Sequence, residues 1–254
     1  MLLELRNYGN RNFFVHFWNK KLGEITNLNY LCHMNFIKKY TIGEEITNSI
    51  SHGVGVLMGL AVCSFFLCKG YLNGSSLAIF SFWLYLFGVV CSYMTSTLYH
   101  SCPVSNVERK TLLRKLDHSA IYWHIAGSYS PITLIAMVAA GEELWAWSIF
   151  SFVWLCAIVG TTLSFRKLKS HSYLETACYV LMGLSILVAF KPFHDCVGTA
   201  IVLWVVAEGV SYIVGAVLYS FKKIPYMHSV FHGFVLLGDV FHMIAVYKIV
   251  EMFL

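Results

Sequence analysis

Five polar side chains at two places in an apolar sequence have the types and spacing of a metal centre. Ser96 and His100 lie four residues apart in STLYH, and Asp117 follows 17 residues after that histidine. His228 and His232 lie four residues apart in MHSVFHGF. Residues at i and i+4 of an α-helix share one face, about 5–6 Å apart at Cβ, so the two imidazoles of the second pair are well placed to chelate.

Three imidazoles with an open fourth position are the ligand set of catalytic rather than structural zinc. We therefore predict that His100, His228 and His232 bind Zn²⁺. We expect the Asp117 carboxylate to hold and deprotonate a water molecule there, and Ser96 to supply a hydrogen bond.

The segments that carry these residues are apolar enough to cross a membrane. Of the 254 residues, 58% are hydrophobic and 12% are charged, against roughly 25% charged in soluble domains. The apolar runs are continuous rather than alternating, which favours helices over strands. We predict an all-α membrane protein with seven transmembrane helices, most of them near the roughly 20 residues that a span requires. The charge-poor windows are 46–68, 77–99, 119–140, 144–165, 172–190, 199–221 and 226–247.

Basic residues orient this bundle, because cytoplasmic loops of membrane proteins carry an excess of Lys and Arg. The N-terminal segment holds six of them, and the next three loops on the same side hold four, three and two, together 15 of the 18 in the chain. The four assigned to the loop before the third helix are Arg109, Lys110, Arg114 and Lys115. Only Lys69, Lys191 and Lys248 fall on the other side. The N-terminus is predicted to be cytoplasmic and the C-terminus outside. The bias accounts for the net charge of +5, so we infer no nucleic-acid partner.

This topology brings the chemically active residues to one depth on the cytoplasmic side. Ser96 and His100 close the second helix, Asp117 opens the third, and His228 and His232 begin the seventh. The topology rests on Lys and Arg alone, so the agreement favours a metal site. The competing interpretation is a set of separately hydrogen-bonded interior histidines.

The other histidines are not assigned to the site. His118 is adjacent to Asp117 and is expected to point elsewhere, and His124 is expected to find a hydroxyl partner inside the bundle. Four more are predicted at the surface or the membrane interface: His16, His33, His171 and His194.

Residues 1–45 are predicted to form a cytoplasmic segment, and residues 46–254 the transmembrane domain. The segment lacks the apolar core of a signal peptide, so the first helix is expected to act as the insertion signal. Met34 precedes NFIKKYTIGEE and would be an adequate start. Residues 1–33 are interpreted either as a dispensable amphipathic extension or as a consequence of start-site choice.

Several spaced motifs resemble the haemolysin III family, the bacterial branch of the progestin and adipoQ receptor family that includes the adiponectin receptors. These motifs are EEITNSISHGVG, SxxxH with its following aspartate, LDHSAIYWHIAGSYSPI and HSVFHGFVLLGDVFH, and the resemblance covers about residues 40–254. It implies seven helices, a cytoplasmic N-terminus and zinc near the inner leaflet. It also implies that His100, His228 and His232 are the ligands, with Asp117 and Ser96 as water-holding neighbours.

Two acidic residues depart from the family pattern. Glu208 and Asp239 stand where small residues are expected, about halfway through their helices. At 100° per residue, Asp239 and His242 fall on the same face as His228 and His232, within an arc of about 80°. One interpretation is that Asp239 is protonated and hydrogen-bonded within the bundle, with His242 and Glu208 as candidate partners. The other is a wet cavity or proton path that leads to the metal.

Three functions are consistent with the sequence. The first is zinc-dependent hydrolysis of a lipid amide or ester, which the relation of the wider superfamily to alkaline ceramidases implies. The second is a receptor or membrane-homeostasis protein with structural zinc. The third is a haemolytic or transport protein that uses the acids at mid-membrane. A membrane lipid is the expected substrate or ligand and a bacterial cytoplasmic membrane the expected location, and the sequence predicts no oligomeric state.

Overall fold

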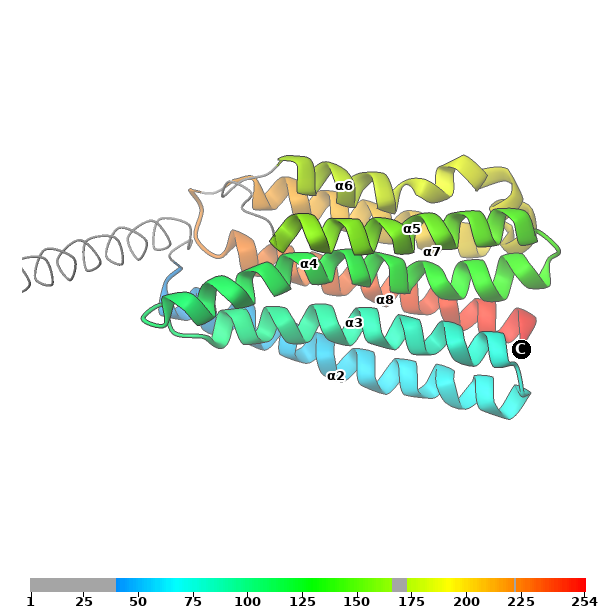
Figure 1. The fold of residues 1–254 in the computed structure, drawn as a ribbon, viewed down its shortest axis with the longest axis horizontal. Helices are drawn as coiled ribbons and strands as arrows, with labels where there is room; N and C mark the ends of the chain where they lie inside the picture. The colour runs from blue at the N-terminus through cyan, green and yellow to red at the C-terminus, as the bar shows by residue number, and fades with distance from the viewer. Residues whose placement is uncertain (1–39, 166–172, 222) are drawn as a thin grey trace, which may run out of the picture.

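A computed structural model describes residues 40–165, 173–221 and 223–254, so the predictions on residues 1–33 lie outside the described residues. Regular structure in the described ranges is entirely helical, which confirms the all-α class. Figure 1 shows the helices running side by side along the longest axis. They are α2 (Ile42–Asn73), α3 (Ser76–Ser101), α4 (Val107–Pro131), the π-helix η1 (Ile132–Met137), α5 (Glu143–Phe165), α6 (Tyr173–Gly183), the 3₁₀-helix η2 (Ser185–Ala189), α7 (Phe190–Tyr219) and α8 (Met227–Phe253).

Capping residues set the ends of the helices near the predicted site. Thr41 and Glu44 form a capping box at the start of α2, which satisfies backbone N–H groups that have no partner within the helix. Gly74, at φ 72°, ends α2 in the left-handed region, and Ser75 then caps α3. Because this link is so short, α2 and α3 are antiparallel neighbours.

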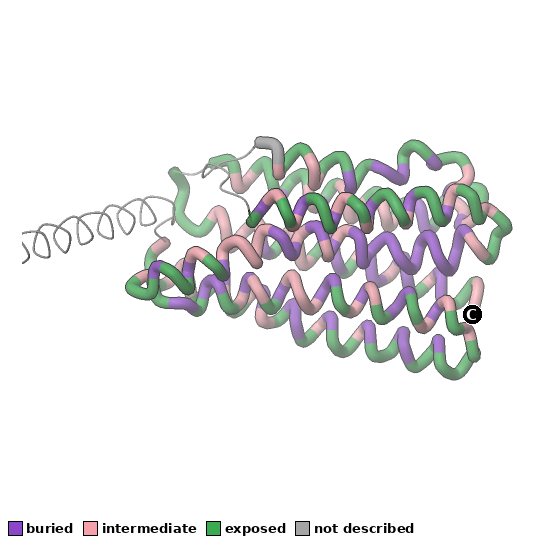
Figure 2. The backbone as a smooth tube through the Cα atoms, viewed as in Figure 1, coloured by how far each residue is buried: buried purple, intermediate pink, exposed green. Residues whose placement is uncertain are grey.

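α2 lies between α3 and α8, the two helices that carry the predicted histidine ligands. α3 also packs closely against α4, where a Cβ on Gly88 would stand 2.5 Å from the carbonyl oxygen of Trp123. Small residues at such crossings let helix backbones approach each other in membrane proteins. The buried positions at the end of α4 and in η1 form the continuous purple band in the middle of Figure 2. Packing in the bundle therefore places the starts of α2, α4 and α8 near the end of α3.

The third predicted helix begins earlier than its apolar window. Asn106 caps α4, so the helix starts at Val107 and includes Arg109 and Lys110, which we had placed in a loop. The prediction that Asp117 opens this helix is therefore wrong by about three turns. A hydropathy window detects only the apolar part of a helix, whereas the charged first turns of α4 continue the same helix.

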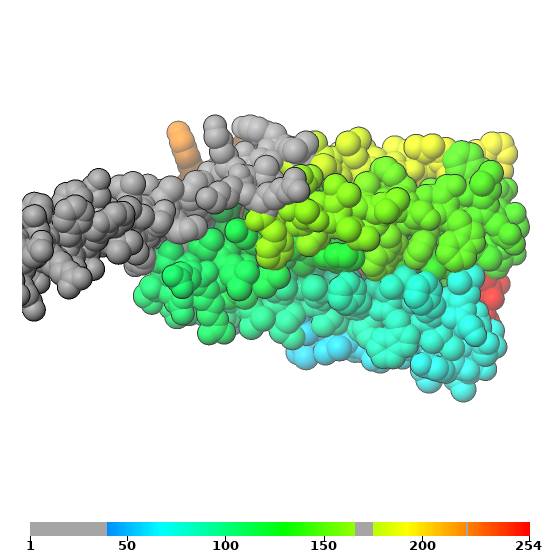
Figure 3. All heavy atoms as spheres, in the orientation of Figure 1, coloured from blue at the N-terminus to red at the C-terminus, as the bar shows by residue number. Residues whose placement is uncertain are grey.

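Five helices in the described part of the chain are long and apolar enough to cross a membrane: Ile42–Asn73, Ser76–Ser101, Glu143–Phe165, Glu175–Tyr219 and Met227–Phe253. The fourth spans 45 residues and comprises α6 from Glu175 on, the 3₁₀-helix η2 and α7. Its backbone leaves the helical region at Gly198, whose φ is 71° and ψ 169°. Large apolar side chains are exposed along these helices, including Trp83 on α3 and Leu155 on α5. α3 in cyan and α5 in lime cover much of the face in Figure 3. Such surfaces are suited to contact with lipid.

Candidate metal centre

The structure brings His100, His228 and His232 together from α3 and α8. One ring nitrogen of each lies within 4.8 Å of the corresponding nitrogens of the other two. Nε2 of His100 and Nε2 of His228 are 3.2 Å apart. Residues 128 positions apart in the chain thus meet at one end of the bundle.

The donor set fits zinc. Zn–N bonds of about 2.0–2.1 Å in a tetrahedral site hold the ligand nitrogens about 3.3–3.4 Å apart, close to the observed separation of His100 and His228. Neutral imidazoles are also the ligands that zinc accepts most readily among nitrogen donors. His100 and His232 are buried, at 3% and 2% exposure, which protects the cluster from bulk water.

The contacts of His232 select the ring nitrogen that faces the cluster. Ser51 Oγ donates to the carbonyl of Asn48 at 2.9 Å and lies 3.0 Å from His232 Nδ1, while the same carbonyl is 3.3 Å from Nδ1. Both oxygens are therefore acceptors for an Nδ1–H group. This tautomer leaves the Nε2 lone pair of His232 for a metal.

Asp117 lies beside the three imidazoles, not among them. It belongs to α4 and is outside the cluster whose ligand atoms are within 4.8 Å. Ser96, which is 3% exposed, is a side-chain hydrogen-bond partner of its carboxylate. His118 Nδ1 is 3.5 Å from Asp117 Oδ2, so the prediction that His118 points elsewhere is wrong. Adjacent positions on a helix diverge, but the long imidazole of His118 reaches back to the carboxylate.

Aromatic rings surround His228. The ring of Tyr40 stacks on it with centroids 5.2 Å apart, and the ring of Tyr219 lies 5.1 Å away. Tyr40 precedes α2, and burial raises the pKa of its phenol, so the hydroxyl stays neutral. These rings shield the cluster at the end of the bundle.

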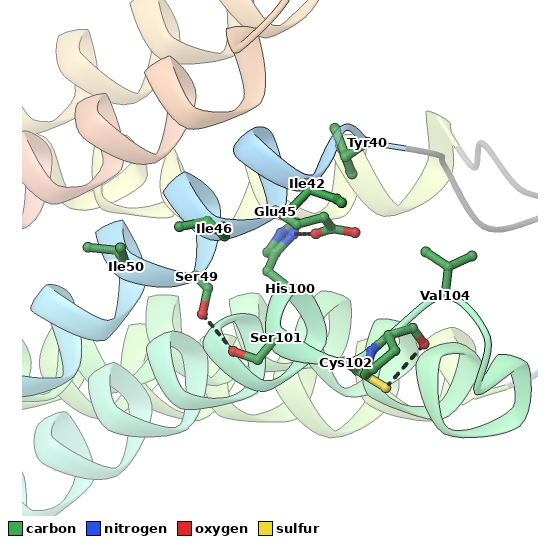
Figure 4. Close-up of a pocket in the computed structure, with 11 residues that line it drawn as sticks. Tyr40, Ile42, Glu45, Ile46, Ser49, Ile50, His100, Ser101, Cys102 and Val104 are labelled. Atoms are coloured by element: carbon green, nitrogen blue, oxygen red, sulfur yellow. Dashed lines mark hydrogen bonds and ion pairs between the residues drawn. The ribbon is translucent and has the colours of Figure 1, made fainter.

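A groove of about 470 Å³ opens between the start of α2 and the end of α3 (Figure 4). Ile42, Ile46 and Ile50 form an apolar row along one wall, and Glu45 contacts His100 at its base. The apolar wall matches an acyl chain in chemistry, and the polar base lies next to the histidine cluster.

A second group of buried polar residues lies farther along α8. Asp239 accepts hydrogen bonds from the hydroxyls of Tyr93 and Tyr212, the latter at 2.5 Å, and its Oδ2 lies 3.2 Å from His124 Nε2. Asp239 is thus hydrogen-bonded within the bundle, as one interpretation held, but the candidate partners His242 and Glu208 were wrong, because phenols on α3 and α7 occupy the carboxylate. His124 was expected to meet a hydroxyl and instead meets this carboxylate.

Glu208 and His242 form a separate pair at 2.8 Å. His242 Nδ1 contacts Glu208 Oε2, and the imidazole is buried at 2% exposure. The two acids singled out from the sequence therefore have different histidine partners.

Sequence reasoning missed the residues of α2 that hold the cluster. Asn48, Ser51 and His52 follow Glu45 at three, six and seven residues, which places all four on one helix face. His52 stacks on His232 with ring centroids 3.5 Å apart. A polar stripe at the start of an otherwise apolar helix was the signal that could have identified them.

An α-helical bundle with lipid-compatible outer surfaces and a cluster of three imidazoles at one end defines a multi-pass membrane protein with a candidate metal site. The haemolysin-III related family matches residues 40–243, and the chain belongs to this family, as its motifs predicted. It is accordingly an integral membrane protein.

Three relatives show how far the similarity extends. The chain is 32% identical to Hemolysin-3 of Bacillus cereus over 198 residues, which is 78% of this chain and 88% of the relative. It is 34% identical to the Hemolysin-3 homolog of Bacillus subtilis (strain 168), over 79% of this chain and 91% of the relative. The monocyte to macrophage differentiation factor of Homo sapiens is 25% identical over 65% of this chain and 68% of its own length.

Proposed function

We propose that this protein binds Zn²⁺ through His100, His228 and His232 and hydrolyses an amide or ester bond of a membrane lipid. The observation that carries the proposal is the convergence of three imidazole nitrogens beside a carboxylate that is not one of them. Catalytic zinc sites leave one coordination position open, and here a carboxylate that can act as a general base lies next to it.

Zinc bound there would polarise a carbonyl group and assist the attack of water on it. Asp117 would accept the proton of the attacking water and later return it to the leaving group, as a general base and then a general acid. The Ser96 hydroxyl would keep the Asp117 carboxylate in position. The apolar groove beside Glu45 and His100 would hold the acyl chain while the polar bond faces the histidines.

The test is metal analysis of the purified protein together with a screen against ceramides and lysolipids. We expect about one zinc per chain and release of a fatty acid from at least one lipid class. Stoichiometric zinc without cleavage of any lipid would favour a receptor or homeostasis protein with structural zinc. Protein that takes up no zinc would contradict the proposal as a whole.

We also propose seven membrane spans with the N-terminus in the cytoplasm of a bacterial cell and the C-terminus outside. The 45 residues from Glu175 to Tyr219 would measure about 67 Å as one straight helix, about twice the thickness of the hydrocarbon core, so they are enough for two spans. Gly198 breaks the helix between the two predicted spans. α4 and η1 together supply the remaining span. Fusions of a reporter enzyme after residue 254 and after residue 221 test this topology. We expect the reporter after residue 254 to lie outside the cell membrane and the reporter after residue 221 to lie in the cytoplasm.

Haemolysis is a second candidate, because two relatives carry the name Hemolysin-3. Lysis of red blood cells by the purified protein would support it. A loss of lysis in His228→Ala would connect the activity to the histidine cluster, whereas unchanged lysis would separate the two.

A further inference from the structure

Glu45 connects the histidine cluster to a buried lysine. Its Oε2 is 2.6 Å from Nδ1 of His100, and its Oε1 is 2.8 Å from Nζ of Lys110. The carboxylate therefore bridges two helices, α3 and α4, from a position in the first turns of α2. Because it accepts the Nδ1–H of His100, it turns Nε2 of the same ring toward His228.

Lys110 holds the backbone on both sides of the same histidine. Its ammonium donates to the carbonyl of Tyr99 at 2.8 Å and to the carbonyl of Cys102 at 2.9 Å. It also lies 4.6 Å from the centre of the Tyr99 ring. These carbonyls belong to the C-terminal end of α3, where backbone acceptors lack partners within the helix and a cation is favoured.

The burial of this contact network distinguishes it from an exposed ion pair. Lys110 is 0% exposed, and the side chain of Glu45 is 14% exposed. A buried ammonium is costly unless charged and polar partners surround it. Here three oxygen atoms and an aromatic ring do so, and two of these oxygens belong to the residues that flank the His100 turn.

We propose that Glu45 and Lys110 are positioning residues of the metal centre, in which Lys110 fixes both the His100 backbone and the Glu45 carboxylate that orients the His100 ring. This rests on the proposed function only in that His100 binds a metal. Neither residue is a ligand. Carboxylates that hold metal-binding histidines in this way typically contribute about 10- to 100-fold to metal affinity.

The first experiment measures zinc affinity on the full-length protein in detergent, by competition with a chelator of known affinity. Glu45→Gln keeps the shape and one acceptor but loses the carboxylate, and we expect zinc affinity to fall about 10- to 100-fold. Glu108→Gln is the matched control, because Glu108 is an exposed residue at the same end of the bundle. Its zinc affinity should equal that of the wild type.

The second experiment tests whether the two residues act as a unit. Lys110→Met removes the ammonium and keeps a side chain of similar length, and we expect it to lower zinc affinity as well. The double variant Glu45→Gln/Lys110→Met should bind zinc no more weakly than the weaker single variant. Fully additive losses would overturn the role assigned to Lys110, because independent residues have additive effects.

A third measurement separates positioning from general stability. Nitrogen NMR of ¹⁵N-histidine-labelled protein without metal should show His100 in the Nδ1–H form, with its signal assigned by its absence from His100→Ala. In Glu45→Gln we expect a mixture of tautomers. If Glu45→Gln lowers only the thermal stability and leaves both the zinc affinity and the tautomer unchanged, the positioning proposal is wrong and the proposed function stands. A wild-type protein that takes up no zinc overturns both.

Discussion

The histidine cluster and the polar network around Asp239 are built from the same residue types and have opposite arrangements. In the cluster, Glu45 contacts the outer nitrogen of His100, and the inner nitrogens of three rings face one another. Around Asp239, both carboxylate oxygens are occupied, one by Tyr212 and the other by Tyr93 and His124. In the first arrangement three ring nitrogens surround one point, whereas in the second the carboxylate oxygens already contact their partners.

This difference shows why buried histidines and acids are not by themselves a metal site. Around Asp239, two phenols and an imidazole meet one carboxylate, so these polar groups satisfy one another and join helices. In the cluster, a carboxylate holds the far side of His100 while nitrogens of three rings converge, and such a carboxylate prepares the ring for a metal. The comparison predicts that substitutions in the two regions affect different properties.

Removal of an imidazole from the cluster should have the largest effect. His228→Ala and His232→Ala are each expected to lose bound zinc, because two imidazoles coordinate the ion inadequately. His100→Ala should do the same and also lower the thermal stability, since the metal no longer joins α3 to α8. Elemental analysis of the purified variants measures this, and the wild type should melt at a lower temperature after chelation.

The control for this prediction comes from the other region. His242→Ala removes a buried histidine of the same helix that pairs with Glu208, and it should keep a full complement of zinc. Zinc retained in the three cluster variants would refute the ligand assignment.

Asp239→Ala should mainly reduce stability. Two phenols and one imidazole would lose their common carboxylate inside the bundle, so we expect the free energy of unfolding to fall by about 3–5 kcal/mol. Zinc content should be unchanged. Unfolding in mixed detergent micelles with an increasing fraction of denaturing detergent measures this loss. Glu251→Ala, which changes an exposed residue on the same helix, is the control. A variant that keeps its stability but loses zinc would show that the two regions are one site.

Asp117→Asn should separate catalysis from metal binding. The amide cannot accept the proton of water, so any lipid hydrolysis should fall at least roughly 10²-fold, while zinc content stays near normal. Asp195→Asn, which changes an exposed aspartate on α7, is the control and should leave both properties unchanged.

Two outcomes would revise the role of Asp117. Loss of zinc in Asp117→Asn would make this residue a ligand and favour structural zinc. Unchanged hydrolysis with zinc present would exclude Asp117 as the base.

Ser51→Ala should have the smallest effect. It removes one of two acceptors of the His232 Nδ1–H and leaves the Asn48 carbonyl, so we expect zinc affinity to fall about 2- to 10-fold. Ser49→Ala is matched to it, because the Ser49 hydroxyl contacts Thr97 and Ser101 and no imidazole. Equal losses in both variants would mean that the Ser51 contact does not orient His232.

Local sequence properties were enough to predict the helical class, the membrane location and the meeting of His100 with His228 and His232. Hydropathy depends on composition within one helix, and the i, i+4 spacing places both residues of a pair on one face. The charge bias then placed the histidines at one depth. Each of these inferences requires only short segments and the thickness of a membrane.

Tertiary structure decided which polar groups pair. Glu45 meets His100 across 55 positions, and Asp239 meets Tyr93 across 146, while no local pattern distinguishes these partners from His242 or Glu208. Lys110 was counted with the loop cations, yet it is buried, because the packing of α3 on α4 places its ammonium under the end of α3. The choice of partners depends on how helices pack along their whole length, since side chains reach only the few neighbours that helix packing brings within hydrogen-bonding distance.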